Sequence, residues 1–348
     1  MGDGRIRVGV IGVGAMGVGH VQAYKGDSRC ELLALCDQSP EWLDHAKREY
    51  GARLGFTKWE DLVACEEVEA VSVCLPTIFH APVTVAALRA GKHVLCEKPM
   101  AMNAGQAREM ADAAREMGKL LLIGYNQRFG GDIQYLKRVV DEGQLGEVYF
   151  VRTGWRRAMG ALPPPTACRA TGPYNRNWFN EKAMGGGVTT DLGSHVVDLA
   201  MYLMGFPKVR QVVGCAYTKF GPEFVAGTGA TFDADDHSVA FAKFENGASM
   251  MIEASFGCYI ERDTVFQAIY GDKGGAHRES GQPVKLFTQV AGAYTTIIPR
   301  IEIASTTPMA HFLDCLTEGK PPLVRPEEGV AVAQILDGIY ASTKADSN

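Results

Sequence analysis

The sequence lacks the features that tie a protein to nucleic acid or to a membrane. No cluster of Lys and Arg is interleaved with aromatic residues, and the formal net charge is −5, so a polyanionic partner is not expected. No apolar stretch approaches the roughly 18 residues of a membrane-spanning helix, and no basic and apolar leader precedes the first predicted strand. We therefore expect a cytoplasmic protein that binds neither nucleic acid nor a membrane.

The sequence also lacks a cysteine framework. Its nine cysteines are scattered without a C-x-x-C pair, and Cys36, Cys74 and Cys96 lie in apolar runs, as small core residues do in a reducing compartment. The acidic cluster from Asp233 to His237 invites a metal, but a turn that enters a strand explains it more simply. We predict no metal.

The chain is long enough to form two domains. The 348 residues exceed what one hydrophobic core usually holds, and 46% apolar with 22% charged residues is ordinary globular usage. The pattern of apolar runs changes beyond residue 124. We predict a first domain over residues 1–124 and a second over 125–348.

The start of the chain carries a dinucleotide-binding fingerprint. A strand-like run from Arg5 to Ile11 leads into G-x-G-x-x-G. In this motif Gly12 permits the tight turn, Gly14 leaves room for the pyrophosphate, and Gly17 lets the helix sit close to the sheet.

The cofactor itself is predicted from the residues around this loop. Ala15 and Met16 offer backbone N–H groups at a helix N-terminus, whose positive dipole end favours phosphate. Asp37 ends the second apolar run, about 20 residues after the last glycine, where a carboxylate binds the ribose hydroxyls and repels a 2′-phosphate. Because Gln38 rather than an arginine follows it, NAD is preferred over NADP.

Apolar runs alternate with helical stretches through the first domain. Helices are expected to begin near Ala15, Glu41, Phe79 and Gly105, and the runs between them are nearly continuously apolar, as parallel strands covered on both faces are. The predicted strands are Arg5–Ile11, Glu31–Cys36, Ala70–Leu75, His93–Cys96 and Leu120–Gly124. This pattern predicts a doubly wound parallel Rossmann sheet of the α/β class.

The second domain has alternating segments typical of an open-faced, mostly antiparallel sheet of the α+β class. Asn246-Gly247, between two alternating runs, predicts a type I′ hairpin. The predicted strands are Val148–Thr153, Val209–Tyr217, Ser238–Phe244, Ala248–Phe256, Thr264–Tyr270 and Val284–Thr288. Two late amphipathic helices within residues 308–343 are candidates to pack back on the first domain.

Two segments carry candidate catalytic groups. Glu97-Lys98-Pro99 follows a predicted parallel strand, and ligands bind at that edge of the sheet. Glu97 is expected to orient the Lys98 ammonium or to contact the nicotinamide ribose. In the second segment, after a triple glycine that we expect to leave the helix start open to a ligand, Asp191 and His195 are spaced i and i+4 and share one helix face. His195 is the candidate base for a hydroxyl proton. Asp191 would bind a neighbouring substrate hydroxyl or orient the imidazole, and Lys98 would stabilise the alkoxide or relay the proton.

These segments together resemble the glucose-fructose oxidoreductase/inositol dehydrogenase/rhizopine-catabolism (Gfo/Idh/MocA) oxidoreductases over nearly the whole chain. The resemblance rests on G-V-G-A-M-G, on the region from Leu75-Pro76-Thr77 through His80 to Glu97-Lys98-Pro99, on Gly124-Tyr125-Asn126-Gln127-Arg128-Phe129, and on the segment from Gly187 to Asp198. It implies that Lys98, Asp191 and His195 are the catalytic set.

The resemblance implies further site residues. Leu75, Pro76, His80, Glu97 and Asn126 are expected at the cofactor, and the open sheet is expected to form a homodimer or homotetramer. One departure is that Leu75-Pro76-Thr77 stands where members commonly carry Thr-Pro-Asn, which removes a side-chain contact to the nicotinamide region.

The implied substrates are sugars, glycosides, anhydrosugars or inositols. A looser resemblance to the pyranoside and anhydrosugar dehydrogenase branch suggests oxidation of a ring hydroxyl, at C3 of a pyranoside. Two groups of aromatic, basic and amide residues, Trp155–Arg157 and Arg176–Phe179, flank a proline-rich loop and offer ring faces and donors to a sugar. The expected substrate-binding residues, besides the catalytic set, are Tyr125, Arg156, Asn177 and Trp178, although subunit packing explains such Trp and Arg residues equally well.

The leading hypothesis is an NAD-dependent dehydrogenase that acts on a secondary alcohol. One alternative is a glycosidase that retains NAD and cleaves by transient oxidation and elimination, and another is a cofactor-binding sensor without turnover. The intact Lys98, Asp191 and His195 argue against the sensor.

Overall fold

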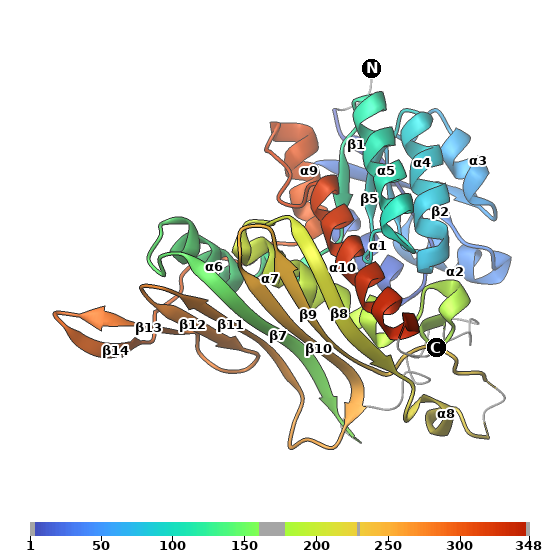
Figure 1. Cartoon of the computed structure of the whole chain (residues 1–348). Coiled ribbons are helices and arrows are strands. Elements are labelled where there is room, and N and C mark those ends of the chain that lie inside the picture. The colour runs from blue at the N-terminus through green and yellow to red at the C-terminus, as the bar shows by residue number, and fades with distance from the viewer. Residues whose placement is uncertain (1–3, 160–177, 228–229, 346–348) are drawn as a thin grey trace. The chain divides into compact units, whose positions relative to one another are not determined.

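A computed structural model describes residues 4–159, 178–227 and 230–345. The chain divides into two compact units (Figure 1). The first contains the described residues up to Asn126 together with Thr306–Val330, and the second contains the remaining described residues. Within the described residues no helix is long and apolar enough to cross a lipid bilayer.

The first unit is built on a six-stranded sheet in the order β3-β2-β1-β4-β5-β6, in which every neighbouring pair is parallel. Its strands are β1 (Ile6–Ile11), β2 (Cys30–Cys36), β3 (Leu54–Phe56), β4 (Ala70–Val73), β5 (His93–Cys96) and β6 (Leu121–Ile123). Its helices include α1 (Ala15–Lys25), α2 (Pro40–Tyr50), α3 (Trp59–Ala64), η1 (Thr77–Phe79), α4 (His80–Arg89) and α5 (Ala104–Met117). This confirms the predicted doubly wound sheet, although the short β3 and α3 were not predicted.

The order of the strands positions the cofactor loop. The chain reverses direction across the sheet between β1 and β4, and the crevice beyond the carboxyl ends of such strands is where ligands bind. Cys74, just after β4, donates its backbone N–H to the carbonyl of Ile11 at 2.8 Å. The glycine loop therefore emerges beside the turn that contains Leu75 and Pro76.

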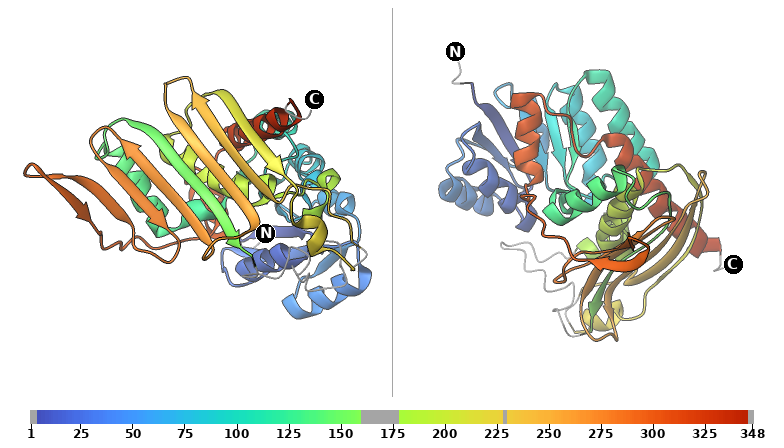
Figure 2. Two further views of the ribbon diagram at one scale, coloured as in Figure 1. Left: turned by 60° about the horizontal axis from the view of Figure 1, so that its bottom comes forward. Right: turned by 90° about the vertical axis from the view of Figure 1, so that its left-hand side faces the viewer.

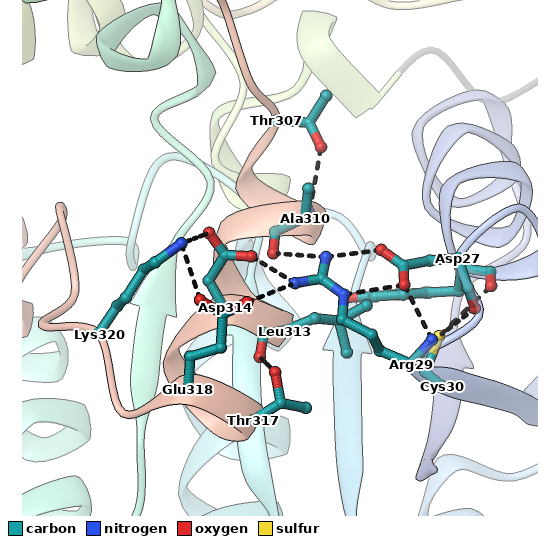
Figure 3. A network of polar contacts seen from close by, with 11 residues as sticks. Asp27, Arg29, Cys30, Thr307, Ala310, Leu313, Asp314, Thr317, Glu318 and Lys320 are labelled. Carbon is teal, nitrogen blue, oxygen red and sulfur yellow. Dashed lines mark hydrogen bonds and ion pairs between the residues drawn. The ribbon is translucent and has the colours of Figure 1, made fainter.

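A late helix, α9 (Pro308–Glu318), belongs to the first unit and packs against α1, β5 and β6. Figure 3 shows the ion-pair network that holds it: Arg29 contacts Asp27 at 2.7 Å, forms an ion pair with Asp314 of α9, and donates to the carbonyl of Ala310 at 3.3 Å. Lys320 then binds the other oxygen of Asp314 at 2.8 Å. These contacts tie the helix to the start of β2.

The second unit is built on an eight-stranded sheet in the order β14-β13-β12-β11-β7-β10-β9-β8, in which only β7 and β10 pair in parallel. Its strands are β7 (Val148–Ala158), β8 (Val209–Tyr217), β9 (His237–Phe244), β10 (Ser249–Cys258), β11 (Thr264–Gly271), β12 (Gly275–Glu279), β13 (Lys285–Val290) and β14 (Ala293–Ile297). The left view of Figure 2 shows the green strand β7 inside this sheet. The predicted, mostly antiparallel sheet is confirmed.

The helices of the second unit cover one face of this sheet. α7 (Ser194–Met204) is apolar on nearly all sides and packs on β7, β10 and β11. The other helical elements are η2 (Asn126–Phe129), α6 (Gly131–Asp141), η4 (Trp178–Asn180), η5 (Lys182–Met184), the π-helix η6 (Thr189–Gly193), α8 (Gly221–Phe224) and α10 (Pro326–Ala345), whose residues after 330 belong to this unit.

The hairpin between β9 and β10 is confirmed, but its predicted turn type is wrong. Only Gly247 has a positive φ, of 88°, and its N–H donates to the carbonyl of Phe244. A type I′ turn needs positive φ at both central residues, so Asn246 does not adopt the predicted conformation. The turn instead resembles a type I turn followed by a left-handed glycine.

Candidate active site

The three glycines of the loop have different surroundings. Gly12 has φ of +88°, and a Cβ built on it would lie 2.5 Å from the carbonyl oxygen of Cys74. A Cβ on Gly17 would lie 1.8 Å from the carbonyl oxygen of Gly12, whereas one on Gly14 meets nothing within 4 Å. The turn and the close helix contact therefore need two of the glycines, and the third borders open space, as a pyrophosphate site requires.

The helix that follows this loop is open at its N-terminus. α1 begins at Ala15, and in the part of the chain that the structure describes no side chain caps it. Its first turn contains no acidic residue. Met16 is 51% exposed. The backbone N–H groups and the positive dipole end at this terminus therefore suit a phosphate.

Asp37 is held beside the loop by backbone groups. Its carboxylate accepts hydrogen bonds from the N–H of Val13 at 3.0 Å and the N–H of Ser39 at 3.1 Å. The indole of Trp42 donates to the carbonyl of Val13 at 2.6 Å. Trp42 was not identified from the sequence, where a single Trp in an amphipathic helix gives no signal.

Beneath the Glu97-Lys98-Pro99 segment lies a buried chain of polar side chains. His20 Nε2 lies 2.9 Å from Glu97 Oε1, His20 Nδ1 lies 3.1 Å from Ser72 Oγ, and Ser72 Oγ lies 2.8 Å from the hydroxyl of Tyr24. The second carboxylate oxygen of Glu97 accepts the N–H of Lys98 at 3.2 Å. The structure thus places Glu97 inside this chain and leaves Lys98 half-buried at the end of β5.

These contacts also set the charge of Glu97. Burial alone would raise the pKa of its carboxyl group, but the hydrogen bond and charge of His20, and then Lys98, outweigh burial and hold the pKa below its usual value. Glu97 is therefore a carboxylate at neutral pH. His20 was missed in the sequence because nothing links residue 20 to residue 97 before the fold is known.

His80 connects the two segments that flank the predicted cofactor site. Its Nδ1 lies 2.7 Å from the carbonyl oxygen of Pro99, and its Nε2 lies 2.7 Å from that of Leu75. Burial lowers the pKa of His80, against the raising effect of these two hydrogen bonds. Thr77, at the departure from Thr-Pro-Asn, is fully buried, and its hydroxyl has no hydrogen-bond partner among the described residues.

The remaining residues predicted in the first unit differ in exposure. Tyr125 is 1% exposed, whereas Asn126, at the start of η2, is exposed. Leu75 and Pro76 are half-buried. Asn126 can therefore contact a ligand as the structure stands, whereas the ring of Tyr125 is part of the core.

The segment that carries Asp191 and His195 has an unusual start. Residues 189–193 form the π-helix η6, and the α-helix begins only at Ser194. Such π-turns are rare and are frequent at functional sites. Asp191 is half-buried and His195 is 7% exposed.

The interpretation that the triple glycine leaves this helix start open is wrong for two of the glycines. A Cβ on Gly186 would lie 2.4 Å from the carbonyl oxygen of Phe179, and one on Gly187 would lie 2.2 Å from Oδ1 of Asp235. The space is filled by protein. Asp235 also accepts the N–H of Thr189 at 2.9 Å and its hydroxyl at 2.6 Å, so Gly187 makes room for a carboxylate that fixes the start of η6.

The acidic cluster is used within the fold. Asp235 caps η6, and Asp236 accepts the N–H groups of Lys219, Phe220 and Gly221 at 2.6–2.7 Å. Across the described part of the chain, no group of three or more His, Cys, Asp and Glu side chains is arranged to hold a metal ion.

An aromatic residue lies against His195. The ring centroids of Trp155 and His195 are 5.5 Å apart. The side chain of Arg156, the next residue of β7, lies on the opposite face of the sheet. There it donates a hydrogen bond to the hydroxyl of Thr264 at 3.1 Å and lies 3.7 Å from the carboxylate of Glu253. The structure thus brings Trp155, and not the predicted Arg156, to His195. Of the other predicted substrate residues, Trp178 is half-buried and stacks on Phe179, and Asn177 lies outside the described residues.

The Gly124–Phe129 and Gly187–Asp198 motifs meet in a buried ion pair. Arg128 is 0% and Asp198 1% exposed, and the guanidinium reaches the carboxylate at 2.6 and 2.9 Å. The guanidinium carbon also lies 4.9 Å from the ring centroids of Tyr202 and Phe206. Arg128 and Asp198, one residue from each motif, therefore have a structural role in the fold that explains their presence without a catalytic one.

Comparison with known proteins matches both halves of the chain to one family. Residues 6–125 match the family described as oxidoreductase family, NAD-binding Rossmann fold, and residues 133–277 match the GFO/IDH/MocA C-terminal domain. The chain is 31% identical over 353 aligned positions to D-glucoside 3-dehydrogenase of Escherichia coli, covering 97% of this chain and 95% of that protein. It is 26% identical to myo-inositol 2-dehydrogenase of Thermotoga maritima, with 93% and 92% covered.

Solved structures share the fold. An oxidoreductase domain protein from Kribbella flavida has a TM-score of 0.83 at 25% identity, with 98% of each chain covered. Levoglucosan dehydrogenase in complex with NADH has a TM-score of 0.84 at 22% identity, again with 98% of each chain covered.

Proposed function

Because the chain belongs to the GFO/IDH/MocA family of oxidoreductases, we propose that it oxidises a secondary ring hydroxyl of a sugar or glycoside, at C3 of a pyranoside. NAD, when bound, accepts the hydride. The observation that carries the proposal is the similarity to D-glucoside 3-dehydrogenase over nearly the full length of both chains, together with the glycine loop and Asp37, which fit a dinucleotide.

The residues of this chain would divide the work as follows. His195 takes the hydroxyl proton as the hydride leaves carbon, and Lys98 stabilises the developing negative charge on the oxygen. Asp191 binds a neighbouring hydroxyl and orients the ring. Glu97 helps to position Lys98 by accepting its backbone N–H. Asp235 helps to position Asp191 by fixing the start of η6.

The first test is an anaerobic assay at 340 nm with NAD and NADP against glucosides, glucose, anhydrosugars, inositols and sugar phosphates, with the product identified by NMR. NADH formation with a glucoside and a 3-keto product supports the proposal. Oxidation elsewhere on the ring, or of inositols alone, contradicts the C3 assignment. Release of aglycone without NADH would instead indicate cleavage by transient oxidation.

The second test concerns the residues. Lys98→Met and His195→Ala are expected to lower kcat by at least about 100-fold, the range for loss of an acid–base group, while NAD binding measured by calorimetry is retained. Lys182→Met, on the exposed face of η5, is the control. Near-normal turnover in both site variants contradicts the assignment.

We propose that the exposed face of the large sheet pairs with a second copy of the chain. Val213, Phe241 and Met251 are 53%, 38% and 46% exposed, and they lie in one cross-strand row over β8, β9 and β10. Apolar surface of this kind is a usual sign of an oligomer interface. We also propose a cytoplasmic location, because the cysteines are scattered without a C-x-x-C pair, and Cys36 and Cys96 are buried in strands as small core residues.

A further inference from the structure

The ring of Trp155 contacts both an imidazole and a guanidinium. Its centroid lies 5.5 Å from that of His195, with the ring planes inclined by 45°, and the guanidinium carbon of Arg157 lies 5.8 Å from the Trp155 ring. Both groups lie within the roughly 6 Å of the ring centroid at which an indole and a cation interact. One ring therefore serves a permanent cation and a group that becomes a cation when it takes up a proton.

The fold holds this ring in place. Side chains of β7 alternate between the two sheet faces, and Thr153 marks the face toward α7 because its hydroxyl donates to the carbonyl of Val196 at 3.1 Å. Trp155, two residues on, is on the same face and packs against the buried cluster that includes Val188 and Leu192. The indole cannot turn away from His195 without opening this cluster.

We infer that Trp155 makes His195 a stronger base by stabilising its protonated form. This rests on the proposed function, in which His195 takes the hydroxyl proton. The negative face of the indole attracts an imidazolium but not a neutral imidazole, so the ring favours proton uptake. Arg157 acts in the opposite direction, because a second cation near the same ring opposes the charge that forms on His195.

The other charged groups around His195 do not change in the variants used below. Asp191 lies four residues earlier, and Asp198 lies three residues later in a buried pair with Arg128. Asp235 is engaged by Thr189 and Tyr340. The residues that β10 and β11 present to the helix side are uncharged: Ile252, Ala254, Val265 and Gln267. The variants therefore leave these described groups unchanged and alter only the indole or Arg157.

The experiment follows the acid limb of the pH profile of kcat/KM and, separately, the NMR titration of the His195 imidazole in the full chain without cofactor or substrate. Trp155→Leu is expected to lower both midpoints by about half a pH unit, as loss of a partly buried cation–π contact predicts. Trp155→Phe is expected to retain part of this shift, and Arg157→Gln to raise both midpoints. Arg152→Gln, an exposed position on the opposite face of the same strand, is the matched control and is expected to leave both midpoints unchanged.

Unchanged midpoints in Trp155→Leu, with a melting temperature near that of the unmodified chain, overturn the inference. A raised KM with unchanged midpoints also overturns it, because Trp155 would then be a platform for the substrate. If Trp155→Leu does not fold, the inference is tested with Trp155→Phe and Arg157→Gln, by the midpoint of the kcat/KM profile and the midpoint of the His195 titration. High turnover in His195→Ala would remove the proposed function, whereas the NMR titration would still report the effect of the indole.

Discussion

The hydroxyl of Tyr340 donates a 2.8 Å hydrogen bond to Asp235, which ties the last helix of the chain to the segment that carries Asp191. Asp235 is 3% exposed, and burial raises the pKa of its carboxyl group although Thr189 and Tyr340 donate to it. A buried carboxylate of this kind is tolerated only with several donors.

Asp235→Ala is therefore expected to lower the free energy of unfolding by about 3 kcal/mol, because it leaves buried donors without an acceptor and opens space beside Gly187. Tyr340→Phe removes one donor and is expected to cost about 1 kcal/mol. Urea unfolding measures both. Asp233→Asn, in the same acidic cluster but exposed, is the control; equal losses at Asp233 and Asp235 would contradict this account.

Replacing Gly14 by alanine is expected to weaken cofactor binding, whereas replacing Gly17 by alanine is expected to destabilise the fold. A Cβ at Gly14 enters open space, so Gly14→Ala should unfold normally but bind NAD at least about tenfold more weakly, since 1.4 kcal/mol of lost binding suffices. A Cβ at Gly17 would collide with the backbone of Gly12, so Gly17→Ala should lose about 3 kcal/mol of stability. Calorimetry and thermal melting separate the two outcomes. A normal NAD affinity in Gly14→Ala would show that the pyrophosphate does not lie there.

Asp37 is expected to control the choice between NAD and NADP. Asp37→Asn removes the charge that repels a 2′-phosphate, yet keeps an oxygen that can accept from Val13 or Ser39. The ratio of kcat/KM for NAD to that for NADP is expected to fall by about tenfold or more. Glu41→Gln, exposed on α2, is the control for a general loss of negative charge. An unchanged ratio would exclude Asp37 from the ribose site.

The lowered pKa of Glu97 gives a prediction for stability against pH. A carboxyl group with a lower pKa in the folded state than in the unfolded state stabilises the fold above about pH 4.3, the unfolded value, and this contribution is lost as the pH falls through the folded value. The unmodified chain should therefore be more stable than Glu97→Gln at pH 7, and the difference should shrink below about pH 4. Urea midpoints from pH 7 to 3.5 test this. A difference that grows on acidification would contradict the sign.

The sheets and the glycine loop could be predicted because their signals are local. Continuous apolar runs, a G-x-G-x-x-G spacing and Asp37 each lie within one segment, and strand, loop and helix agree on one structure. β3 (Leu54–Phe56) was not predicted, because three half-buried residues are too few to show a periodic pattern.

The parts that could not be predicted depend on contacts between distant segments. Nothing in the sequence pairs His20 with Glu97, or Tyr340 with Asp235. In the sequence Trp155 is one of several aromatic and basic residues. It is distinguished from Arg156 only when the paired strands show which face of the sheet each side chain lies on. The π-helix at Asp191 was also beyond prediction, because a single i, i+4 spacing does not distinguish a π-turn from an α-turn.

The exposed row on the large sheet leads to the last prediction. If a second copy covers Phe241, a carboxylate at this position would be buried without a partner in the assembly, at a cost of several kcal/mol per subunit. Phe241→Asp is therefore expected to shift the protein to monomer in light scattering and sedimentation at micromolar concentration, with little loss of monomer stability because the side chain is 38% exposed. Lys182→Asp, which also introduces a carboxylate at an exposed position but outside the sheet, should leave the assembly intact. An unmodified chain that is already monomeric would contradict the proposed assembly, and a Phe241→Asp variant that assembles normally would place the subunit contact elsewhere.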